Sequence, residues 1–545
     1  MTSTRIFGSG VAAVVLALIA LPASAQSFRV QCPSSTTLHS NETSGTYTGP
    51  HVVTKTITRK DGTTFTKDYV DNGGGIKCQE ISGGDGFATM GDGTQTYLFG
   101  FGPLSGLAQM ANGQEGTVKP TVFNTDNATV LNALSIGAPV NQSDGTLTVN
   151  GTTTPYTFNG AVGYARNPAV SGYPLDGHVD PRLVMDVGVM NANMPAPLMA
   201  IDEDDEFFLT LTNVGQVMRP DLFEQHTVHF HGYPNASAFY DGVPDASVAI
   251  NIGGSFTYYY LAPDAGTYFW HCHISPPEHL QMGMVGQLFV RPRQNRVAAN
   301  ASLRDALLQQ QNDRRTACTT EGILCSTPIP AANSATHVLN KHGDPTLYAY
   351  NDGDGSTAYD VEYPIQIHGF DPNFHFVGMT FNPESFTDLK DKYFLLNGRS
   401  YPDTVQPGTM TTQSTDGTLH ASQPLPTIIN IPAGGRALLR IADLDVTEYQ
   451  TLASLGIRMH VIGLNARLLR DMAGNNMAYD SNSITLAGGE SIDVILDATG
   501  YTAGQHFYLY TPNLDHLSND AENFGGLMTE VNICNAVDPT TKECT

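Results

Sequence analysis

The sequence is poor in charged residues and contains a single tryptophan. Only 14% of its 545 residues are charged, and apolar heptad repeats are absent, which argues against a coiled coil or a helical repeat array. Basic residues are also scarce, with 27 lysines and arginines against 52 aspartates and glutamates and a formal net charge of −25. Because such a surface repels nucleic acid and anionic lipid, we expect neither as a partner.

Long apolar runs are missing as well, so we expect no transmembrane segment. The apolar run from Val11 to Leu21 is too short to span a bilayer. It follows Arg5 and precedes Ala23-Ser24-Ala25, a pattern typical of a secretory signal peptide covering residues 1–25. The protein is therefore expected to be exported, either to the periplasm or as a secreted protein.

The seven cysteines are compatible with an oxidising compartment. Cys272 stands apart because two histidines flank it, and the other six cysteines allow fifteen pairings that the sequence cannot distinguish. Short separations favour two disulfides and leave a third by elimination: Cys318–Cys325, Cys534–Cys544 and Cys32–Cys78. Unpaired thiols are the alternative.

The predicted fold class is all-β. Glycine and proline are abundant, with 54 and 32 residues, and short alternating segments are typical of strands between turns. Strands are expected at Phe207–Thr212, Ser255–Leu261, Thr267–Trp270, Gly286–Val290, Thr427–Ile431, Ala437–Ile441, Met459–Leu464, Ser491–Leu496 and His506–Tyr510. They predict two antiparallel sandwich or barrel units.

Composition also suggests the boundaries of these units. After the signal peptide we expect a loop-rich N-terminal extension over residues 26–80. The first unit would cover 81–297, with an insertion at about 112–185, and a connector would follow over 298–355. The connector opens with a short helical segment at Ala301–Gln310, and the second unit covers 356–545.

Histidines gather in two short segments of the first unit. One segment contains His226, His229 and His231, and the other contains His271-Cys272-His273 followed by His279, Met282 and Met284. Because alternate residues of a strand point to opposite faces, two paired strands would sort these side chains into two groups.

The first predicted group has the donors of a type 1 copper site. His226 and Cys272 share one face, and His279 and Met284 join them from the following loop. Together they supply a soft thiolate, two imidazoles and a weak thioether, which is the set that blue copper takes. Met282 is the less favoured alternative to Met284.

The second predicted group consists of imidazoles only, from His229, His231, His271 and His273. Such a face suits copper that binds O2 or a small anion, and the backbone at Cys272 would join the two sites. Ordinary structural histidines are one alternative, and a zinc site is another because zinc also takes nitrogen and sulfur ligands. Eight candidate ligands exceed the four of a closed zinc site.

These segments resemble the first cupredoxin domain of the multicopper oxidases, which here carries the type 1 copper motif. The resemblance rests on residues 229–232, 241–244, 253–258 and 266–273, and it covers about 195–293. A weaker similarity to the copper-free second domain of the family covers about 393–532. The resemblance implies two cupredoxin-like Greek-key domains, a type 1 copper, and a type 2/type 3 copper cluster. It also implies that His271, Cys272 and His273 carry electrons between the two sites.

The resemblance implies an oxidoreductase that uses O2 as the electron acceptor. The substrate would be a metal ion such as Mn²⁺, Fe²⁺ or Cu⁺, or a phenol. A full cluster in the family takes eight histidines, and this unit supplies four. In the second unit His460 stands alone where another pair is expected. Either a homo-oligomer completes the cluster or the second site is smaller.

Two other functions stay open at this point. Copper nitrite reductases share the type 1 pattern, but they have aspartate at the position of His229 and no histidine after the cysteine. A blue-copper electron carrier without catalysis is the other alternative.

Three further features are weaker. The acidic run Asp202–Glu206 is expected either as a solvated turn or as a patch that steers metal cations to copper. Trp270 is expected to pack around the copper pocket, with a role in electron transfer as the less favoured alternative. Glu278, next to His279, is expected either to touch a substrate or to lie at the rim of the site.

Overall fold

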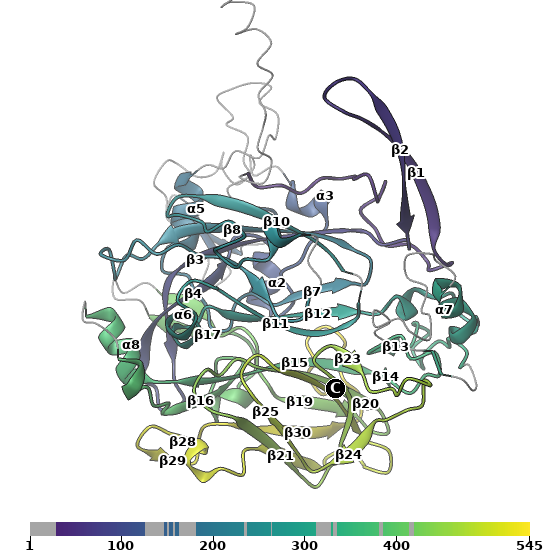
Figure 1. Cartoon of the computed structure of the whole chain (residues 1–545). Helices are drawn as coiled ribbons and strands as arrows, with labels where there is room; N and C mark the ends of the chain where they lie inside the picture. The colour runs from purple at the N-terminus through teal and green to yellow at the C-terminus, as the bar shows by residue number, and fades with distance from the viewer. Residues whose placement is uncertain are drawn as a thin grey trace, which may run out of the picture.

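The computed structural model describes residues 29–125, 146–149, 152–155, 159–162, 181–233, 237–262, 264–311, 329–330, 335–380, 385–413 and 419–545 (Figure 1). The predicted signal peptide, the Cys318–Cys325 pair and most of the predicted insertion lie outside the described residues. Within the described ranges, no helix has the length and apolar character needed to cross a membrane.

The first unit is a sandwich of two four-stranded sheets. One sheet has the order β10-β8-β3-β4, with bounds Ser255–Leu261, Glu206–Gly215, Ile76–Thr89 and Gln95–Pro103. The other has the order β7-β12-β11-β9, with bounds Met199–Asp202, Val285–Arg291, Gly266–His271 and His229–Phe230. Aromatic side chains such as Phe256, Tyr258 and Trp270 fill the space between the sheets.

The second unit is also a sandwich. A nine-stranded sheet contains β15 (Val361–Phe370), β16 (Tyr393–Leu396), β20 (Arg436–Asp443), β22 (Met459–Leu464), β23 (Arg467–Leu468), β24 (Tyr479–Ser481), β26 (Ser491–Asp497), β28 (Ser518–Asn519) and β29 (Glu522–Asn523). A five-stranded sheet contains β19 (Ile429–Pro432), β21 (Gln450–Leu455), β25 (Ser483–Leu486), β27 (His506–Tyr510) and β30 (Met528–Cys534). Aliphatic residues dominate its core.

The remaining elements are short. The helices are α2 (Leu107–Ala111), α3 (Pro120–Phe123), α5 (Pro181–Gly188), α6 (Pro276–Met282), α7 (Leu303–Gln311) and α8 (Pro372–Met379). Four two-stranded sheets pair β1 (His51–Thr58) with β2 (Thr64–Asp71), β5 (Thr146–Val149) with β6 (Thr152–Pro155), β13 (Leu347–Tyr348) with β14 (Ala358–Tyr359), and β17 (Met410–Gln413) with β18 (Leu419–Ser422).

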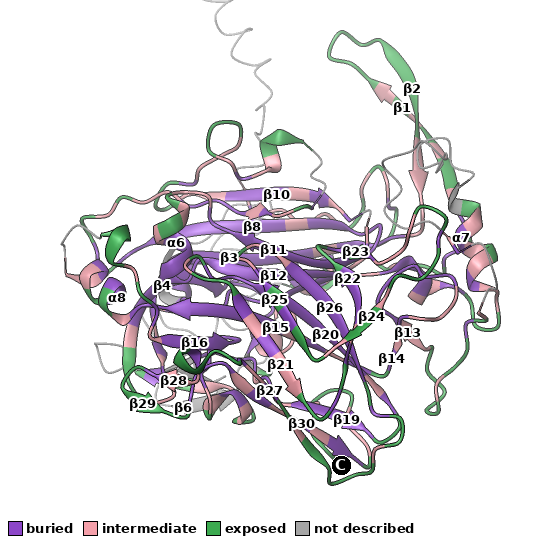
Figure 2. Cartoon of the chain, turned by 60° about the horizontal axis from the view of Figure 1, so that its bottom comes forward, coloured by how far each residue is buried: buried purple, intermediate pink, exposed green. Residues whose placement is uncertain are grey.

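Buried polar contacts join the two units. The Thr267 hydroxyl on β11 donates to Asp493 Oδ1 on β26 at 2.6 Å, and the Ser491 hydroxyl donates to the carbonyl of Thr267 at 2.6 Å. Gln287 on β12 donates to the carbonyl of Arg440 at 2.8 Å. Figure 2 shows these central strands as largely buried, so the second unit covers one face of the first.

The predicted all-β class is confirmed, and the disulfides Cys32–Cys78 and Cys534–Cys544 are present. Cys272 is the one free cysteine among the described residues, and it is buried. The helical segment expected at Ala301–Gln310 is α7. The cysteine loop, by contrast, forms α6 rather than an irregular loop, with two prolines in its first turn where their missing N–H groups cost nothing.

The expected roles of the acidic run Asp202–Glu206 are wrong. Its last four residues are only 2%, 6%, 0% and 3% exposed, so the run is neither a solvated turn nor a steering patch. Arg293 pairs with Glu203 at 3.1 Å and with Asp204 at 2.7 Å, while Glu206 contacts His39 at 2.8 Å. Asp205 accepts hydrogen bonds from the Ser44 hydroxyl and the Gly75 N–H, both at 2.7 Å, so each buried carboxyl group has a polar partner.

Candidate metal centre

Strand pairing places the two histidine segments side by side. β9 is antiparallel to β11, with Phe230 opposite Trp270 and His229 opposite His271. His226 precedes β9 and forms an isolated antiparallel bridge with Ile250. Trp270 is fully buried against Phe101 and Phe230, with ring centroids 5.0 and 5.9 Å away. Trp270 therefore packs in the core of the first unit, and its place beside a copper pocket stays a prediction.

The first site gathers His226, Cys272 and His279. One donor atom from each lies within 4.8 Å of the others, and all three residues are buried. His279 Nδ1 is 3.3 Å from Cys272 Sγ, and the backbone N–H of Thr227 points at the same sulfur from 3.4 Å. The sulfur of Cys272, directly after β11, thus lies close to His226, which precedes β9, and to His279 in α6.

The chemistry of this donor set fits a bound metal ion. Both ring nitrogens of His226 are buried without a hydrogen-bond partner, which is costly unless a bound ion satisfies one of them. Burial raises the pKa of the Cys272 thiol, but His279 and His226 outweigh it and hold that pKa well below its ordinary value. Cys272 is thus set to be a thiolate, the form that binds metals.

Met284 lies beside the same site, against Gly83 of β3. A Cβ built on Gly83 would be 2.7 Å from His226 Cδ2 and 3.5 Å from the Met284 methyl. Met284 is fully buried, and its carbonyl accepts a hydrogen bond from the Cys272 N–H at 3.1 Å. Sequence reasoning missed Gly83, although a glycine inside a strand is a signal of close approach.

Helix α6, which carries His279, is held by the second unit. The ring of His368 donates to the carbonyl of Leu280 at 2.9 Å, and that of His375 donates to the carbonyl of Gln281 at 2.9 Å. The amide of Gln281 donates to Asp391 at 2.9 Å. These second-unit histidines are therefore positioning residues for the cysteine loop.

The second site gathers His229, His231 and His271, whose donor atoms also lie within 4.8 Å of one another. His231 Nε2 is 2.9 Å from His271 Nε2. His273 lies against this group, with its ring centroid 4.9 Å from that of His229. Only these two groups of histidine, cysteine or carboxylate donors come together in this way within the described ranges.

Hydrogen bonds orient two of these rings so that Nε2 faces inward. His229 Nδ1 donates to the carbonyl of Asp241 at 2.7 Å, and His271 Nδ1 donates to the carbonyl of Cys272 at 2.6 Å. Burial lowers the pKa of His271 to about 3 and that of His231 to about 4. Neutral imidazoles with oriented nitrogens are ready to bind a metal.

His460, considered above for this site, and two other histidines of the second unit have partners elsewhere. His460 contacts Asp480 at 2.7 Å, His506 contacts Asn532 at 2.5 Å, and His516 contacts Gln450 at 2.9 Å. None of them belongs to the two donor groups. In the described part of this chain, the second site is therefore built from first-unit imidazoles.

Glu224 is a further residue at the first site that sequence reasoning missed. Its Oε2 is 3.8 Å from His279 Nε2, and its side chain is 27% exposed. It therefore links the buried His279 ring to the surface. Its position two residues before His226 was the only available signal.

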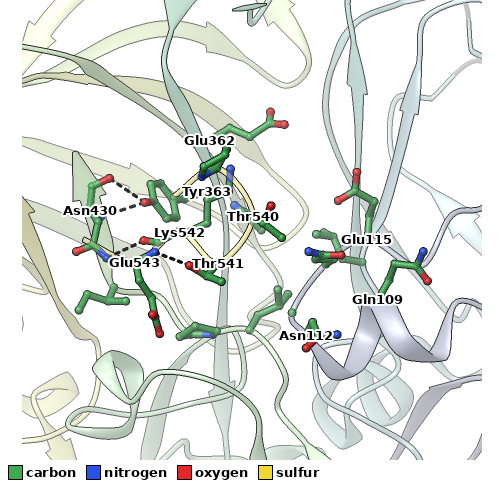
Figure 3. A pocket seen from close by; sticks show the side chains of 18 of the residues that line it. Gln109, Asn112, Glu115, Glu362, Tyr363, Asn430, Thr540, Thr541, Lys542 and Glu543 are labelled. Carbon is green, nitrogen blue, oxygen red and sulfur yellow. Dashed lines mark hydrogen bonds between the residues drawn. The ribbon is translucent and has the colours of Figure 1, made fainter. Parts of the chain in front are cut away.

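A pocket of about 520 Å³ lies away from both sites (Figure 3). It opens between the end of α2, strand β12 and the C-terminal loop that contains Lys542. Charged and amide side chains line it, including Glu115, Arg291 and Glu362. None of the candidate metal ligands is among its lining residues.

Known proteins resemble the part of the chain that carries both sites. The profile of the multicopper oxidase family matches residues 177–295. Multicopper oxidase MCE of Talaromyces pinophilus is 33% identical over 112 residues, which are 20% of this chain and 17% of that protein. A copper-containing nitrite reductase of Rhizobium meliloti is 33% identical over 109 residues, 19% of this chain and 26% of that protein.

The solved structure of a multicopper oxidase, mgLAC, has a TM-score of 0.45 and 15% identity, covering 85% of this chain and 87% of that one. The curated relatives align with this chain over only a small share of their own length. Residues 177–295 therefore match a multicopper oxidase domain, and the resemblance to that family is confirmed for this segment.

Proposed function

We propose that the protein is a copper oxidoreductase of the multicopper oxidase type that passes single electrons from a reducing substrate to O2. The observation that carries the proposal is the convergence of Cys272, His226 and His279 on one point, one residue along the chain from the His271 imidazole of a second site. This pairing of a sulfur site with an imidazole site suits electron transfer followed by catalysis.

The first site is assigned to a type 1 copper. His226, Cys272 and His279 would hold the ion, and Met284 would supply a weak thioether ligand. Copper bound by this set supplies one-electron redox chemistry. Hydrogen bonds from His368 and His375 to backbone carbonyls of α6 hold this helix in place, and with it the ligand His279.

The proposed route between the sites runs through the backbone from the last residue of β11, His271, to Cys272 and His273 directly after it. His271 Nδ1 donates to the carbonyl of Cys272, so the imidazole is tied to the cysteine both covalently and by a hydrogen bond. His273 is the other covalent neighbour. We assign His271, Cys272 and His273 to electron transfer from the first site to the second.

The second site is assigned to a type 2/type 3 copper cluster, with His229, His231, His271 and His273 as its ligands. Four imidazoles suffice for one or two copper ions. A full cluster would need further ligands from a neighbouring subunit. Copper analysis distinguishes these cases, since four ions per chain support the full cluster and fewer support a smaller site.

The reducing substrate is proposed to be a metal cation rather than a phenol. Glu224 is the partly exposed carboxylate that faces His279 Nε2. A carboxylate at the point of electron entry attracts a cation by its charge, whereas a neutral phenol gains only a hydrogen bond from it. The net negative charge of the whole chain also favours the approach of a cation.

A nitrite reductase is the second candidate, because a copper-containing nitrite reductase of Rhizobium meliloti is 33% identical to this chain over 109 residues. Steady-state turnover of the copper-loaded protein decides between the two. The oxidase proposal expects O2 consumption with Fe²⁺, Mn²⁺ or Cu⁺ as the donor. Faster turnover of nitrite under argon than of O2 in air would contradict it, and the absence of both would leave an electron carrier.

Export is proposed on the basis of the signal peptide expected over residues 1–25. The disulfides Cys32–Cys78 and Cys534–Cys544 are in keeping with an oxidising compartment. Mass spectrometry of the protein from the periplasm or the medium should give an N-terminus just after Ala25. A mature protein that retains residues 1–25 would contradict the proposal.

A further inference from the structure

Helix α6, which carries His279, contacts strand β4 of the first unit and strand β15 of the second (Figure 1). Next to it, the second unit buries two carboxyl groups, Asp391 and Asp445, which are only 4% and 2% exposed. The buried Gln281 of α6 joins this pair to the helix, because its amide donates to Asp391 Oδ1 at 2.9 Å. Neither candidate metal site uses these two acids.

The two carboxyl groups meet at Gly369 of β15. A Cβ built on Gly369 would be 2.1 Å from Asp391 Oδ2 and 2.6 Å from Asp445 Oδ2, so only glycine leaves both groups room. The charged groups that act most strongly on Asp391 are Asp445 and Asp371, and both are acidic. Two carboxyl groups that share a buried place in this way disfavour the ionisation of one of them.

The hydrogens available at Thr447 lead to the same conclusion. The Thr447 hydroxyl contacts Asp391 Oδ2 and also lies 2.9 Å from Asp445 Oδ1. A hydroxyl carries one hydrogen, so it can donate to only one of these oxygens. If both acids were ionised, the other contact would join two acceptors with no hydrogen between them. A proton on one acid removes the conflict, because that acid then donates to Thr447.

The surrounding hydrogen bonds assign this proton to Asp391. Asp445 accepts from the backbone N–H of Thr447 at 2.8 Å and from the Gln450 amide at 2.6 Å, and these donors favour its charged form. Asp391 has the Gln281 amide as its donor and the shared contact with Thr447. Burial and the charge of Asp445 also hold the pKa of Asp391 well above its ordinary value.

We propose that Asp391 is a neutral carboxylic acid in the folded protein and that it positions the helix that carries His279. Its O–H donates to the Thr447 hydroxyl, which in turn donates to the Asp445 carboxylate. Its other oxygen accepts from Gln281, two residues after His279 in α6. Asp391 is thus a positioning residue that acts through Gln281, and only its effect on copper rests on the proposed function.

The titratable groups around the pair provide no positive charge that would replace the proton. Asp371, which precedes α8, acts on Asp391, whereas Asp443 of β20 and His368 of β15 interact with Asp445. Burial lowers the pKa of His368, so its ring stays neutral. Loss of the proton from Asp391 would leave two like charges side by side. The free energy of unfolding should therefore fall as pH rises, since the unfolded chain releases this proton first.

Infrared difference spectroscopy of the full chain, with and without copper, tests the protonation. A protonated carboxyl group has a C=O stretching band that is separate from the bands of carboxylates. The spectrum of the wild type at neutral pH should contain such a band that is missing from Asp391→Asn. Spectra in which Asp391→Asn removes only carboxylate bands would overturn the proposal.

A matched pair of variants tests which acid holds the proton. In Asp391→Asn the new amide reproduces the neutral acid, because its oxygen accepts from Gln281 and its NH2 group donates to Thr447. Its denaturant midpoint should not fall, and its stability should depend less on pH. In Asp445→Asn an NH2 group faces the donors of Thr447 or Gln450, so the midpoint should fall. Damage by Asp391→Asn and tolerance of Asp445→Asn would overturn the assignment.

The visible band of the copper-loaded protein tests the effect on α6. Gln281→Leu removes the amide between Asp391 and the helix, so the band should shift, whereas Asp391→Asn keeps this contact and should leave the band in place. An unchanged band in Gln281→Leu would contradict the positioning role. A wild type without a visible band would contradict the copper assignment instead, and the infrared result would still decide the state of Asp391.

Discussion

Cys272 and His271 are consecutive residues whose side chains belong to different sites. Cys272 Sγ lies 3.3 Å from His279 Nδ1, whereas His271 Nε2 lies 2.9 Å from His231 Nε2. Because the chain is extended here, neighbouring side chains diverge while their backbones stay bonded. This geometry underlies the proposed electron route, and it separates the expected effects of substitutions at the two residues.

Replacement of Cys272 by serine should abolish the intense visible absorption that a copper–thiolate bond gives. The hydroxyl is a hard, weak ligand compared with a thiolate, so the first site should lose its copper. Absorption and copper content of the purified variant provide the measurement. The imidazole site should keep its copper, and a visible band that survives the substitution would contradict the assignment.

Replacement of His229 and His231 by alanine should have the opposite effect. The variant should lose copper from the second site and lose O2 consumption by a hundredfold or more, because the acceptor site is removed. Its visible band should persist, since Cys272, His226 and His279 are untouched. Equal loss of the band and of turnover would show that the two sites are not separable.

The substitution Gly83→Ala should damage the first site without touching a ligand. The added methyl would lie 2.7 Å from His226 Cδ2, so the ring or strand β3 must shift. We expect a destabilisation of about 1–3 kcal/mol, typical of overpacking, together with a shifted visible band. Ser82→Ala on the same strand is the control, because the Ser82 hydroxyl has no hydrogen-bond partner, and its band should match the wild type.

The strands around the sites could be predicted because their pattern is local. Ser255–Leu261 was expected and is β10 with the same bounds, since alternate aromatic residues point into the core. The separation of the histidines into two groups followed from the same two-residue period, although their roles as copper ligands stay predictions. The glycine-rich β3 was not expected, because Ser82 to Gly86 favours a turn by composition and is a strand only through its neighbours.

Contacts that join distant parts of the chain could not be predicted from one sequence. His368 is 88 residues from Leu280, whose carbonyl it binds. The contacts of His375 and Glu224 could not be predicted for the same reason, since no local sequence pattern links either residue to α6. The burial of Glu203 and Asp204 likewise depends on Arg293, which is 90 and 89 residues away in the sequence.

Replacement of Glu224 by glutamine should change the use of cationic donors more than that of neutral ones. The amide keeps the size of the side chain and removes its charge, so KM for Fe²⁺ or Mn²⁺ should rise about tenfold or more. Turnover of an uncharged phenol should change little. Glu522→Gln, at an exposed position on β29, is the control, and equal changes for both donor types in the Glu224 variant would contradict the proposed role.

Glu80 should make the stability of the protein fall as pH rises. Burial raises the pKa of this carboxyl from 4.5 to about 8, and its Oε2 has no hydrogen-bond partner. Between these values the unfolded chain has released the proton and the folded chain retains it, so the free energy of unfolding declines with increasing pH. Glu80→Gln should remove this part of the decline.

Chemical unfolding of the wild type and of Glu80→Gln at a series of pH values provides the measurement. The variant should gain stability over the wild type as pH rises from 4.5 to 8, whereas Glu522→Gln, at an exposed position, should not. A constant difference across this range would contradict the inferred protonation of Glu80.

The most direct test of the account is an anomalous difference map at the copper edge from crystals of the copper-loaded protein. If the two copper sites are assigned correctly, one peak should be bonded to Cys272 Sγ, His226 and His279. Separate density should lie among His229, His231, His271 and His273. A map without a peak at Cys272 Sγ, or with a single ion bound only by the imidazoles, would contradict it.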